Sequence, residues 1–267
     1  MKIIGLQFDI AWENPQVNFE TIGKMIEKNP PEANSLLILP EMFATGFTMN
    51  AELARQAGKP SEQLIADIST KYNCYTVGGL VENAADGHPY NYACIRNPDG
   101  SRALRYKKIH QFGDERNHYA AGHRVCTAKI NAFSVCPLIC YDLRFPETFR
   151  QATNSGVDIF VVIASWPTPR IEHWKSLLKA RAIENQAYVV GINRIGKAPT
   201  NEYDGQSLIF DYAGNEIAYL DNKQGFISAD LSLDELNQYR AKYPFLHDIT
   251  NNITGCFSKK LIKGSLR

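Results

Sequence analysis

The chain has 267 residues, of which 44% are hydrophobic and 21% are charged. Its 29 basic and 28 acidic side chains nearly balance and form no long run of one sign. This composition is typical of a soluble globular protein and argues against a nucleic-acid partner or a membrane partner, since both favour strongly charged or strongly apolar sequences.

The N-terminal stretch after Met1, KIIGLQFDI, is apolar but too short to cross a bilayer. It also lacks the small-residue cleavage site of a secretory signal, so we interpret it as a first strand and expect a cytoplasmic protein. The cysteines form no CxxC pair and have no histidine at metal-ligand spacing, which favours free thiols in a reducing compartment and no metal site. The six are Cys74, Cys94, Cys126, Cys136, Cys140 and Cys256.

Short runs of β-branched and aliphatic residues alternate with longer amphipathic stretches along the whole chain, which indicates an α/β architecture. Turn signals at Pro98-Asp99-Gly100 and Ala213-Gly214-Asn215 predict antiparallel hairpins. The predicted strands, in chain order, are Lys2 to Asp9, Ser35 to Leu39, Cys74 to Val81, Tyr90 to Arg96, Ala103 to Tyr106, Arg124 to Ile130, Val135 to Ile139, Asp158 to Ile163, Ala187 to Asn193, Ser207 to Asp211 and Gly225 to Asp230.

Amphipathic periodicity predicts four helices among these strands. They run from Gln16 to Glu27, Ser61 to Thr70, Pro146 to Asn154 and His173 to Asn185. In the last of them, Trp174, Leu177 and Leu178 share one face and are expected to pack on a sheet. Many strands with helices placed to cover them predict a four-layer α-β-β-α sandwich of two mixed sheets with helices outside, in a single domain spanning residues 1–267.

The first segment that can carry chemistry is SLLILPEMF, in which the predicted strand ends at Pro40 and is followed at once by Glu41. Because α/β sheets open their ligand crevices at the carboxyl ends of strands, Glu41 is a candidate general base. The competing interpretation is a solvated loop acid, since exposed acids greatly outnumber catalytic ones.

The second segment, RYKKIHQFGDERNHYAAG, follows the predicted strand that ends at Tyr106. Consecutive lysines usually form a solvated face. If the strand alternation continues, however, Lys107 and Lys108 point to opposite sides, so at most one of them enters a pocket. An ammonium placed there could stabilise a developing oxyanion.

The third segment, FSVCPLICYDLRFPETFR, runs from a strand into Cys140 and then into a helix that begins at Pro146. Such a strand-to-helix elbow exposes one side chain and leaves the following backbone N–H free to donate. Helix N-termini and nearby cations lower the pKa of a thiol, so we expect Cys140 to be a nucleophile enriched in thiolate. For the other five cysteines, core packing is the expected role.

Together the three segments resemble the nitrilase superfamily of carbon-nitrogen hydrolases. Glu41 in LPEMF, Lys108 in YKKIH and Cys140 in CYDLRFPE match the Glu-Lys-Cys triad of that family in its order. The family's K-x-H-x-F pattern selects Lys108 rather than Lys107. The resemblance runs from Ile3 to Asp230 and is strongest to the ω-amidase group, whose members hydrolyse 2-oxoglutaramate and succinamate.

The resemblance implies a cysteine-dependent amidase that needs no metal or organic cofactor. Glu41 would act as the base toward Cys140, and Lys108 with the backbone N–H of Tyr141 would bind the oxyanion. The family's second glutamate matches Glu115, which would orient Lys108 and the attacking water.

Arg144 and Arg170 are candidate ligands for a substrate carboxylate, because the arginine fork matches that group with two contacts. For Arg144, a structural pairing with Asp142 or Glu147 is an equal alternative. Three aromatic residues are expected to line the pocket, although core packing is an equal alternative for the last two. These are Tyr141, Trp166 and Tyr203.

Several alternatives stay open. Within the superfamily the chain could be an N-carbamoyl amidase or a nitrilase rather than an ω-amidase. It could also be a catalytically silent homologue that binds a metabolite or a partner protein. A papain-like Cys-His pair is disfavoured, because the glutamate and lysine already supply a base and a cation. The resemblance also implies a homodimer, formed through the helices flanking the elbow and the stretch from Tyr239 to His247.

Overall fold

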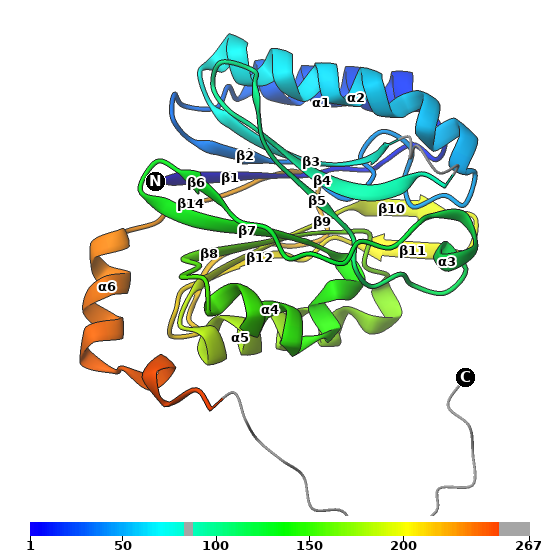
Figure 1. Cartoon of the computed structure of the whole chain (residues 1–267). Helices are drawn as coiled ribbons and strands as arrows, with labels where there is room; N and C mark the ends of the chain where they lie inside the picture. Colours follow the sequence, from blue (N-terminus) through cyan, green and yellow to red (C-terminus); the bar gives the residue numbers. More distant parts are fainter. Residues whose placement is uncertain (83–87, 251–267) are drawn as a thin grey trace, which may run out of the picture.

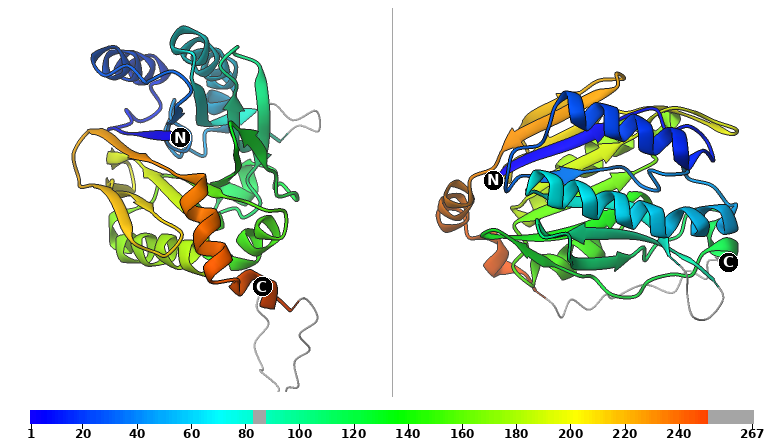
Figure 2. Two further views of the ribbon diagram at one scale, coloured as in Figure 1. Left: turned by 90° about the vertical axis from the view of Figure 1, so that its left-hand side faces the viewer. Right: turned by 90° about the horizontal axis from the view of Figure 1, so that it is seen from above.

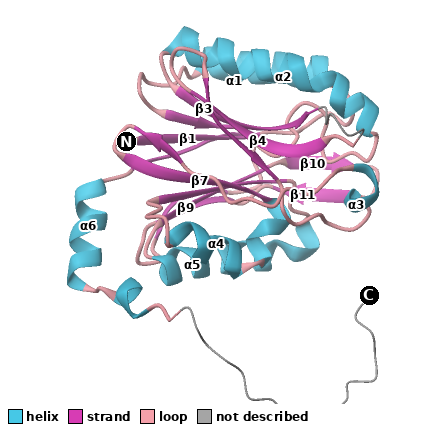
Figure 3. Ribbon diagram, in the orientation of Figure 1, coloured by secondary structure: helices cyan, strands magenta, loops and turns pink. Residues whose placement is uncertain are grey.

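Two six-stranded mixed sheets lie face to face, and helices cover the outer side of each sheet (Figures 1 and 3). The structure is a computed structural model that describes residues 1–82 and 88–250. The first sheet has the order β14 (Gly225–Asp230), β1 (Lys2–Gln7), β2 (Leu36–Ile38), β3 (Tyr75–Glu82), β4 (Tyr90–Arg96) and β5 (Arg102–Lys107). The second has the order β13 (Glu216–Leu220), β12 (Ser207–Phe210), β9 (Tyr188–Asn193), β8 (Ile159–Ala164), β7 (Phe133–Ile139) and β6 (Ala128–Ile130).

The outer layers are pairs of helices. The first sheet carries α1 (Pro15–Lys28) and α2 (Ala51–Tyr72), which run side by side above it (Figure 2). The second carries α4 (Pro146–Thr153) and α5 (Ile171–Asn185). The predicted four-layer sandwich is therefore confirmed. A further helix, α6 (Leu233–Lys242), lies outside the layers near the N-terminus (Figure 2).

Strand alternation explains how one sheet serves two hydrophobic layers. In β2, Leu36 and Ile38 join the core between the sheets, whereas Leu37 joins the cluster beneath α1 and α2. On the opposite side of the molecule, Trp174 and Leu178 of α5 are fully buried in the core that includes β9, as their helical spacing predicts.

The central strands were predicted well, but several other elements were not. Helix α2 begins at Ala51 rather than Ser61, and only Ala128–Ile130 of the predicted strand from Arg124 is extended. The sequence interpretation also lacked eight elements. These are α3 (Glu115–His118), β10 (Ile195–Ala198), β11 (Asn201–Asp204), β13, α6 and the 3₁₀ helices η1 (Cys140–Arg144), η2 (Thr168–Arg170) and η3 (Phe245–Asp248).

Most of the cysteines pack as expected. Cys74, Cys94 and Cys136 are buried free thiols, and Cys126 is a half-buried one. Cys256 lies outside the described residues. None of the helices in the described ranges combines the length and the apolar character that crossing a bilayer requires.

The topology brings the three segments of interest to one end of the sandwich. Strands β2 and β3 are parallel, and two successive antiparallel pairings return β5 to the same direction, so the segments after β2 and β5 leave the first sheet at one edge. Gly79 of β3 permits the close approach, since a Cβ there would lie 2.6 Å from the Glu41 Cα. Strand β7 of the second sheet ends immediately before Cys140.

Candidate active site

A buried lysine lies between two buried glutamates. The Lys108 Nζ is 2.9 Å from the Glu41 Oε1 and 2.8 Å from the Glu115 Oε2. The three side chains are at most 1% exposed. Because desolvated charges are tolerated only when paired and hydrogen-bonded, this cluster must be held by further donors.

Those donors come from three other parts of the chain. The Asn91 side-chain amide donates to the Glu41 Oε1 at 2.8 Å and to the Glu115 Oε1 at 3.0 Å. The backbone N–H of Phe112 donates to Glu115 at 2.8 Å, and that of Ser165 donates to the Glu41 Oε2 at 2.9 Å. Every carboxylate oxygen of the cluster thus accepts at least one hydrogen bond.

The charges of the cluster determine the protonation of its members. Burial alone lowers the pKa of Lys108, but the carboxylates of Glu115 and Glu41 outweigh it, so the pKa lies above its ordinary value and the ammonium persists. Burial raises the pKa of Glu115 even though Lys108 opposes the shift. The site therefore keeps a fixed cation in contact with both carboxylates.

Cys140 occupies a strained elbow. It opens the 3₁₀ helix η1 (Cys140–Arg144) directly after β7, with a φ of +46° that side chains other than glycine rarely adopt. The buried carboxylate of Asp142 holds this turn: it accepts from the Ile139 backbone N–H at 3.0 Å and from the Tyr106 hydroxyl at 2.7 Å. The backbone N–H of His110 donates to it at 2.9 Å.

The expected lowering of the Cys140 pKa, and with it the enrichment in thiolate, was wrong. Burial of the sulfur and the nearby Glu41 carboxylate raise the pKa of Cys140 well above its ordinary value, although Lys108 and the Ser165 backbone N–H oppose the shift. The resting group is therefore a thiol, and its attack requires a base. The charges that act on it come from Glu41, Lys108 and Glu115 rather than from a histidine.

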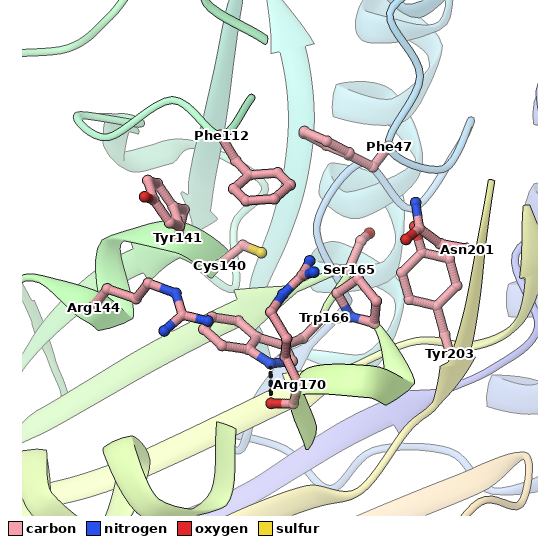
Figure 4. A pocket seen from close by; sticks show the side chains of 11 residues that line it. Phe47, Phe112, Cys140, Tyr141, Arg144, Ser165, Trp166, Arg170, Asn201 and Tyr203 are labelled. Carbon is pink, nitrogen blue, oxygen red and sulfur yellow. Dashed lines mark hydrogen bonds between the residues drawn. The ribbon is translucent and has the colours of Figure 1, made fainter. Parts of the chain in front are cut away.

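The Cys140 sulfur points into a pocket of about 420 Å³, open mouth included (Figure 4). Its walls are mostly aromatic, with two arginines. The lining residues are Phe47, Phe112, Cys140, Tyr141, Arg144, Ser165, Trp166, Pro167, Arg170, Asn201 and Tyr203. Glu41, Lys108 and Glu115 are buried and do not line it.

The four predicted substrate-binding residues all line this pocket. The Arg144 guanidinium stacks over the Trp166 ring at 4.8 Å and contacts the His173 Nδ1 at 3.2 Å. The Arg170 guanidinium lies 5.1 Å from the Phe112 ring. Within residues 1–82 and 88–250 neither arginine forms a salt bridge, so the alternative pairing of Arg144 with Asp142 or Glu147 was wrong.

Tyr141 follows Cys140 in η1, and its ring also lines the pocket. A first-turn N–H has no acceptor within its own helix, so the backbone of Tyr141 can donate to a bound group. In the part of the chain that the structure describes, no three histidine, cysteine, aspartate or glutamate side chains form a cluster able to hold a metal ion.

The sequence interpretation missed several residues of the site, among them Phe47, Asn91, Ser165 and Asn201. Asn91 lies in β4 with no motif of its own, although its position on a strand beside β5 places its backbone carbonyl 2.9 Å from the Lys108 N–H. Asp142 was read as a partner of Arg144. Asn201 comes from β11, a strand that the sequence analysis did not predict.

Comparisons with known proteins cover almost the whole chain. The sequence profile of the family Carbon-nitrogen hydrolase matches residues 4–241. The 2-oxoglutaramate amidase of Bacillus subtilis (strain 168) is 35% identical over 93% of this chain and 97% of that protein. Omega-amidase YafV of Yersinia enterocolitica is 35% identical over 93% of this chain and 96% of that protein.

A solved structure is similar at the level of the fold and of the sequence. XC1258 from Xanthomonas campestris, a CN-hydrolase superfamily protein with an arsenic adduct in its active site, superimposes with a TM-score of 0.87 at 28% identity. The superposition covers 96% of this chain and 99% of that one.

The two adjacent lysines provide a matched test of this geometry. Lys108→Met would leave two buried carboxylates without their cation, and we expect it to lower the free energy of unfolding by about 3 to 5 kcal/mol and turnover by orders of magnitude. Lys107 is half-buried and lies over the Tyr90 ring at 3.5 Å, so Lys107→Met is expected to cost about 1 kcal/mol or less and to leave turnover nearly unchanged. Urea unfolding and steady-state rates measure both, and an inactive Lys107 variant would contradict the assignment.

Proposed function

The chain belongs to the carbon-nitrogen hydrolase family, as its three segments predicted, and we propose that it hydrolyses the terminal amide of a small dicarboxylic acid monoamide, of the 2-oxoglutaramate or succinamate type, to the acid and ammonia. One observation carries the choice of substrate: two arginines without a carboxylate partner in the described residues stand in the same aromatic pocket as the cysteine. Relatives named 2-oxoglutaramate amidase and omega-amidase support it.

In the acylation half, Glu41 takes the thiol proton as the Cys140 sulfur attacks the amide carbonyl. The raised pKa of the thiol makes this transfer necessary. The Lys108 ammonium and the backbone N–H of Tyr141 bind the oxyanion of the tetrahedral intermediate. The C–N bond then breaks, Glu41 returns its proton to the nitrogen, and ammonia leaves a thioester on Cys140.

In the second half, water attacks the thioester carbonyl while Glu41 takes a proton from it. The same oxyanion site serves again, and the released sulfur recovers a proton as the acid departs. The Glu115 Oε2 lies 2.8 Å from the Lys108 Nζ, so we assign it the orientation of the ammonium and of the water. These steps require only the residues of this chain.

The far end of the substrate would meet arginine. Arg144 and Arg170 are half-buried, and a bidentate contact to a carboxylate in such a place is worth about 1.5 to 3 kcal/mol. Aromatic walls favour an apolar chain between carboxylate and amide. An α-ammonium, as in glutamine or asparagine, would approach these guanidiniums and the Lys108 ammonium, so both amino acids should be poor substrates.

We propose further that one carbon-nitrogen hydrolase domain spans the chain and that it works in the cytoplasm. The family match from residue 4 to residue 241 supports the single domain. The free thiols at Cys74, Cys94, Cys126, Cys136 and Cys140 support a reducing compartment.

A homodimer is the proposed assembly. Leu236 is the only residue of α6 that is buried, while Tyr243 and Phe245 just beyond it are 37% and 59% exposed. Ile183 on α5 is 49% exposed. Large apolar side chains gathered near one part of the surface favour a partner surface, and an isologous contact between two copies is the commonest arrangement.

The role of Cys140 is tested by removing its sulfur. Cys140→Ala and Cys140→Ser are expected to abolish turnover, because a serine hydroxyl is far less acidic than a thiol and Glu41 is matched to the thiol. The thermal midpoint should change little. Cys126→Ala, at another half-buried cysteine, is the control and should retain full activity. Appreciable steady-state hydrolysis by the alanine variant would remove Cys140 from the nucleophile role.

Substrate choice is tested with two amides of the same chain length, one of which ends in a carboxylate and the other in a methyl group. We expect kcat/KM for succinamate to exceed that for butyramide by about ten- to a hundredfold, the worth of one arginine-carboxylate contact. Arg144→Gln and Arg170→Gln, made singly, should show which arginine binds the carboxylate, with the loss confined to anionic substrates.

Ammonia release across a wider panel separates the alternatives. The panel contains 2-oxoglutaramate, glutamine, asparagine, a carbamoyl amino acid and a nitrile. Preference for either of the last two would favour an N-carbamoyl amidase or a nitrilase, and no turnover of any compound would favour a silent binding protein. Equal kcat/KM values for succinamate and butyramide would mean that neither arginine binds the substrate carboxylate.

The assembly is tested by light scattering. We expect a mass of twice the 30.0 kDa chain, and Phe245→Asp should shift it toward the monomer because it buries a charge in the contact. Val17→Asp, at a 44% exposed residue on α1, is the matched control and should leave the mass unchanged. A monomeric wild-type chain would contradict the proposal.

A further inference from the structure

Ser165 occupies the position next to both the base and the nucleophile. It is the first residue after β8, and Cys140 is the first residue after β7. The two strands are parallel neighbours in the second sheet, so both residues lie at the same edge. The Ser165 backbone N–H donates to the Glu41 Oε2 at 2.9 Å, and it also acts to lower the pKa of the Cys140 thiol. The residue lines the pocket and is only 4% exposed (Figure 4).

The hydroxyl of this serine has no hydrogen-bond partner within residues 1–82 and 88–250, although its oxygen is buried. Leaving a buried hydroxyl unsatisfied is unfavourable, and such groups in native proteins call for an explanation. Four other buried side-chain atoms in the described residues share this property, but none of them belongs to a residue that lines the pocket. The Ser165 Oγ is thus the uncommitted hydrogen-bonding group beside the sulfur.

We propose that the Ser165 hydroxyl binds the amide nitrogen of the substrate, accepting one of its N–H groups, and so selects the leaving group. This inference rests on the proposed function. Lys108 and the backbone N–H of Tyr141 already bind the oxyanion, so the NH₂ group is the remaining hydrogen-bonding substituent on the reacting carbon. An acceptor is what that group requires.

The position of the hydroxyl also suits the departure of ammonia. The same residue contacts Glu41 through its backbone, so a nitrogen held by the Oγ lies near the carboxyl group that must protonate it. Ser165 itself transfers no proton: the proton that Glu41 took from Cys140 goes to the nitrogen, the C–N bond breaks, and the thioester remains. The serine contributes orientation.

The test compares an amide with the corresponding ester, which has no N–H to offer. Ser165→Ala is expected to lower kcat/KM for succinamate by about ten- to a hundredfold, the range for one buried hydrogen bond, and to change kcat/KM for monomethyl succinate less than about twofold. Because the hydroxyl has no partner to lose, the thermal midpoint of the variant should stay equal or rise.

Ser61→Ala is the matched control. Ser61 is also buried, but its hydroxyl donates to the Ala57 carbonyl at 2.6 Å within α2, remote from the pocket. This variant should lower the thermal midpoint and leave the ratio of amide to ester rates unchanged. Ser165→Ala should therefore change the ratio of amide to ester rates without lowering the thermal midpoint, whereas Ser61→Ala should lower the midpoint without changing the ratio.

Other outcomes separate this inference from the function on which it rests. An equal loss on amide and ester in Ser165→Ala, or no loss on either, would overturn the role of the hydroxyl while leaving the amidase assignment intact. A wild-type chain that releases no ammonia from any carboxylated amide would overturn the proposed function itself.

Discussion

The buried ammonium of Lys108 is the constraint around which the site is organised. Removing an ammonium and two carboxylates from water is tolerable only when their charges are matched and their remaining oxygens have donors. Those donors come from β4, from the loop after β5 and from the end of β8, that is, from both sheets. The two halves of the sandwich must therefore meet in one register for the cluster to exist, and small displacements of either sheet would leave a charge unpaired.

That cluster also decides how the thiol reacts. Burial of the sulfur and the neighbouring Glu41 carboxylate make a thiolate unfavourable at Cys140, so the sulfur stays protonated until Glu41 accepts its proton. The charge that lines the pocket is positive instead, because Arg144 and Arg170 are cationic and have no carboxylate partner in the described ranges. A ligand with a neutral amide at one end and a carboxylate at the other fits this polarity in only one orientation, and that orientation brings the amide to the sulfur.

The sequence interpretation succeeded where one physical signal dominated. Apolar strands buried on both faces, such as β7 and β8, are continuous in the sequence, and the three segments after β2, β5 and β7 carry recognisable patterns. It failed where tertiary contacts override local preference. Helix α2 continues through Pro60, which ordinarily ends a helix. Its backbone packs closely against the Val81 carbonyl of β3, an approach that Gly58 permits because it has no Cβ.

The same limit applied to the site. Glu41, Lys108, Cys140 and Glu115 could be matched to a family pattern, and Arg144, Trp166, Arg170 and Tyr203 could be proposed as pocket residues, whereas Phe47, Ser165 and Asn201 were not. Asn91 could not, because an asparagine in a strand signals nothing until the partner strand places it between two carboxylates. The protonation of Cys140 was also beyond the sequence, since it depends on desolvation and on charges from two distant segments.

Two locally unfavourable features lie side by side at the ends of β7 and β8: the positive φ of Cys140 and the unsatisfied hydroxyl of Ser165. Each can persist because its strand is buried along its whole length, so the surrounding packing determines the backbone path more strongly than the local strain opposes it. Such features reduce the stability of the free protein. A ligand that supplies the missing hydrogen bond regains part of that free energy on binding, and it does so only if its amide reaches the sulfur. The rigid centre of the second sheet is thus the element that makes selection of the leaving group possible.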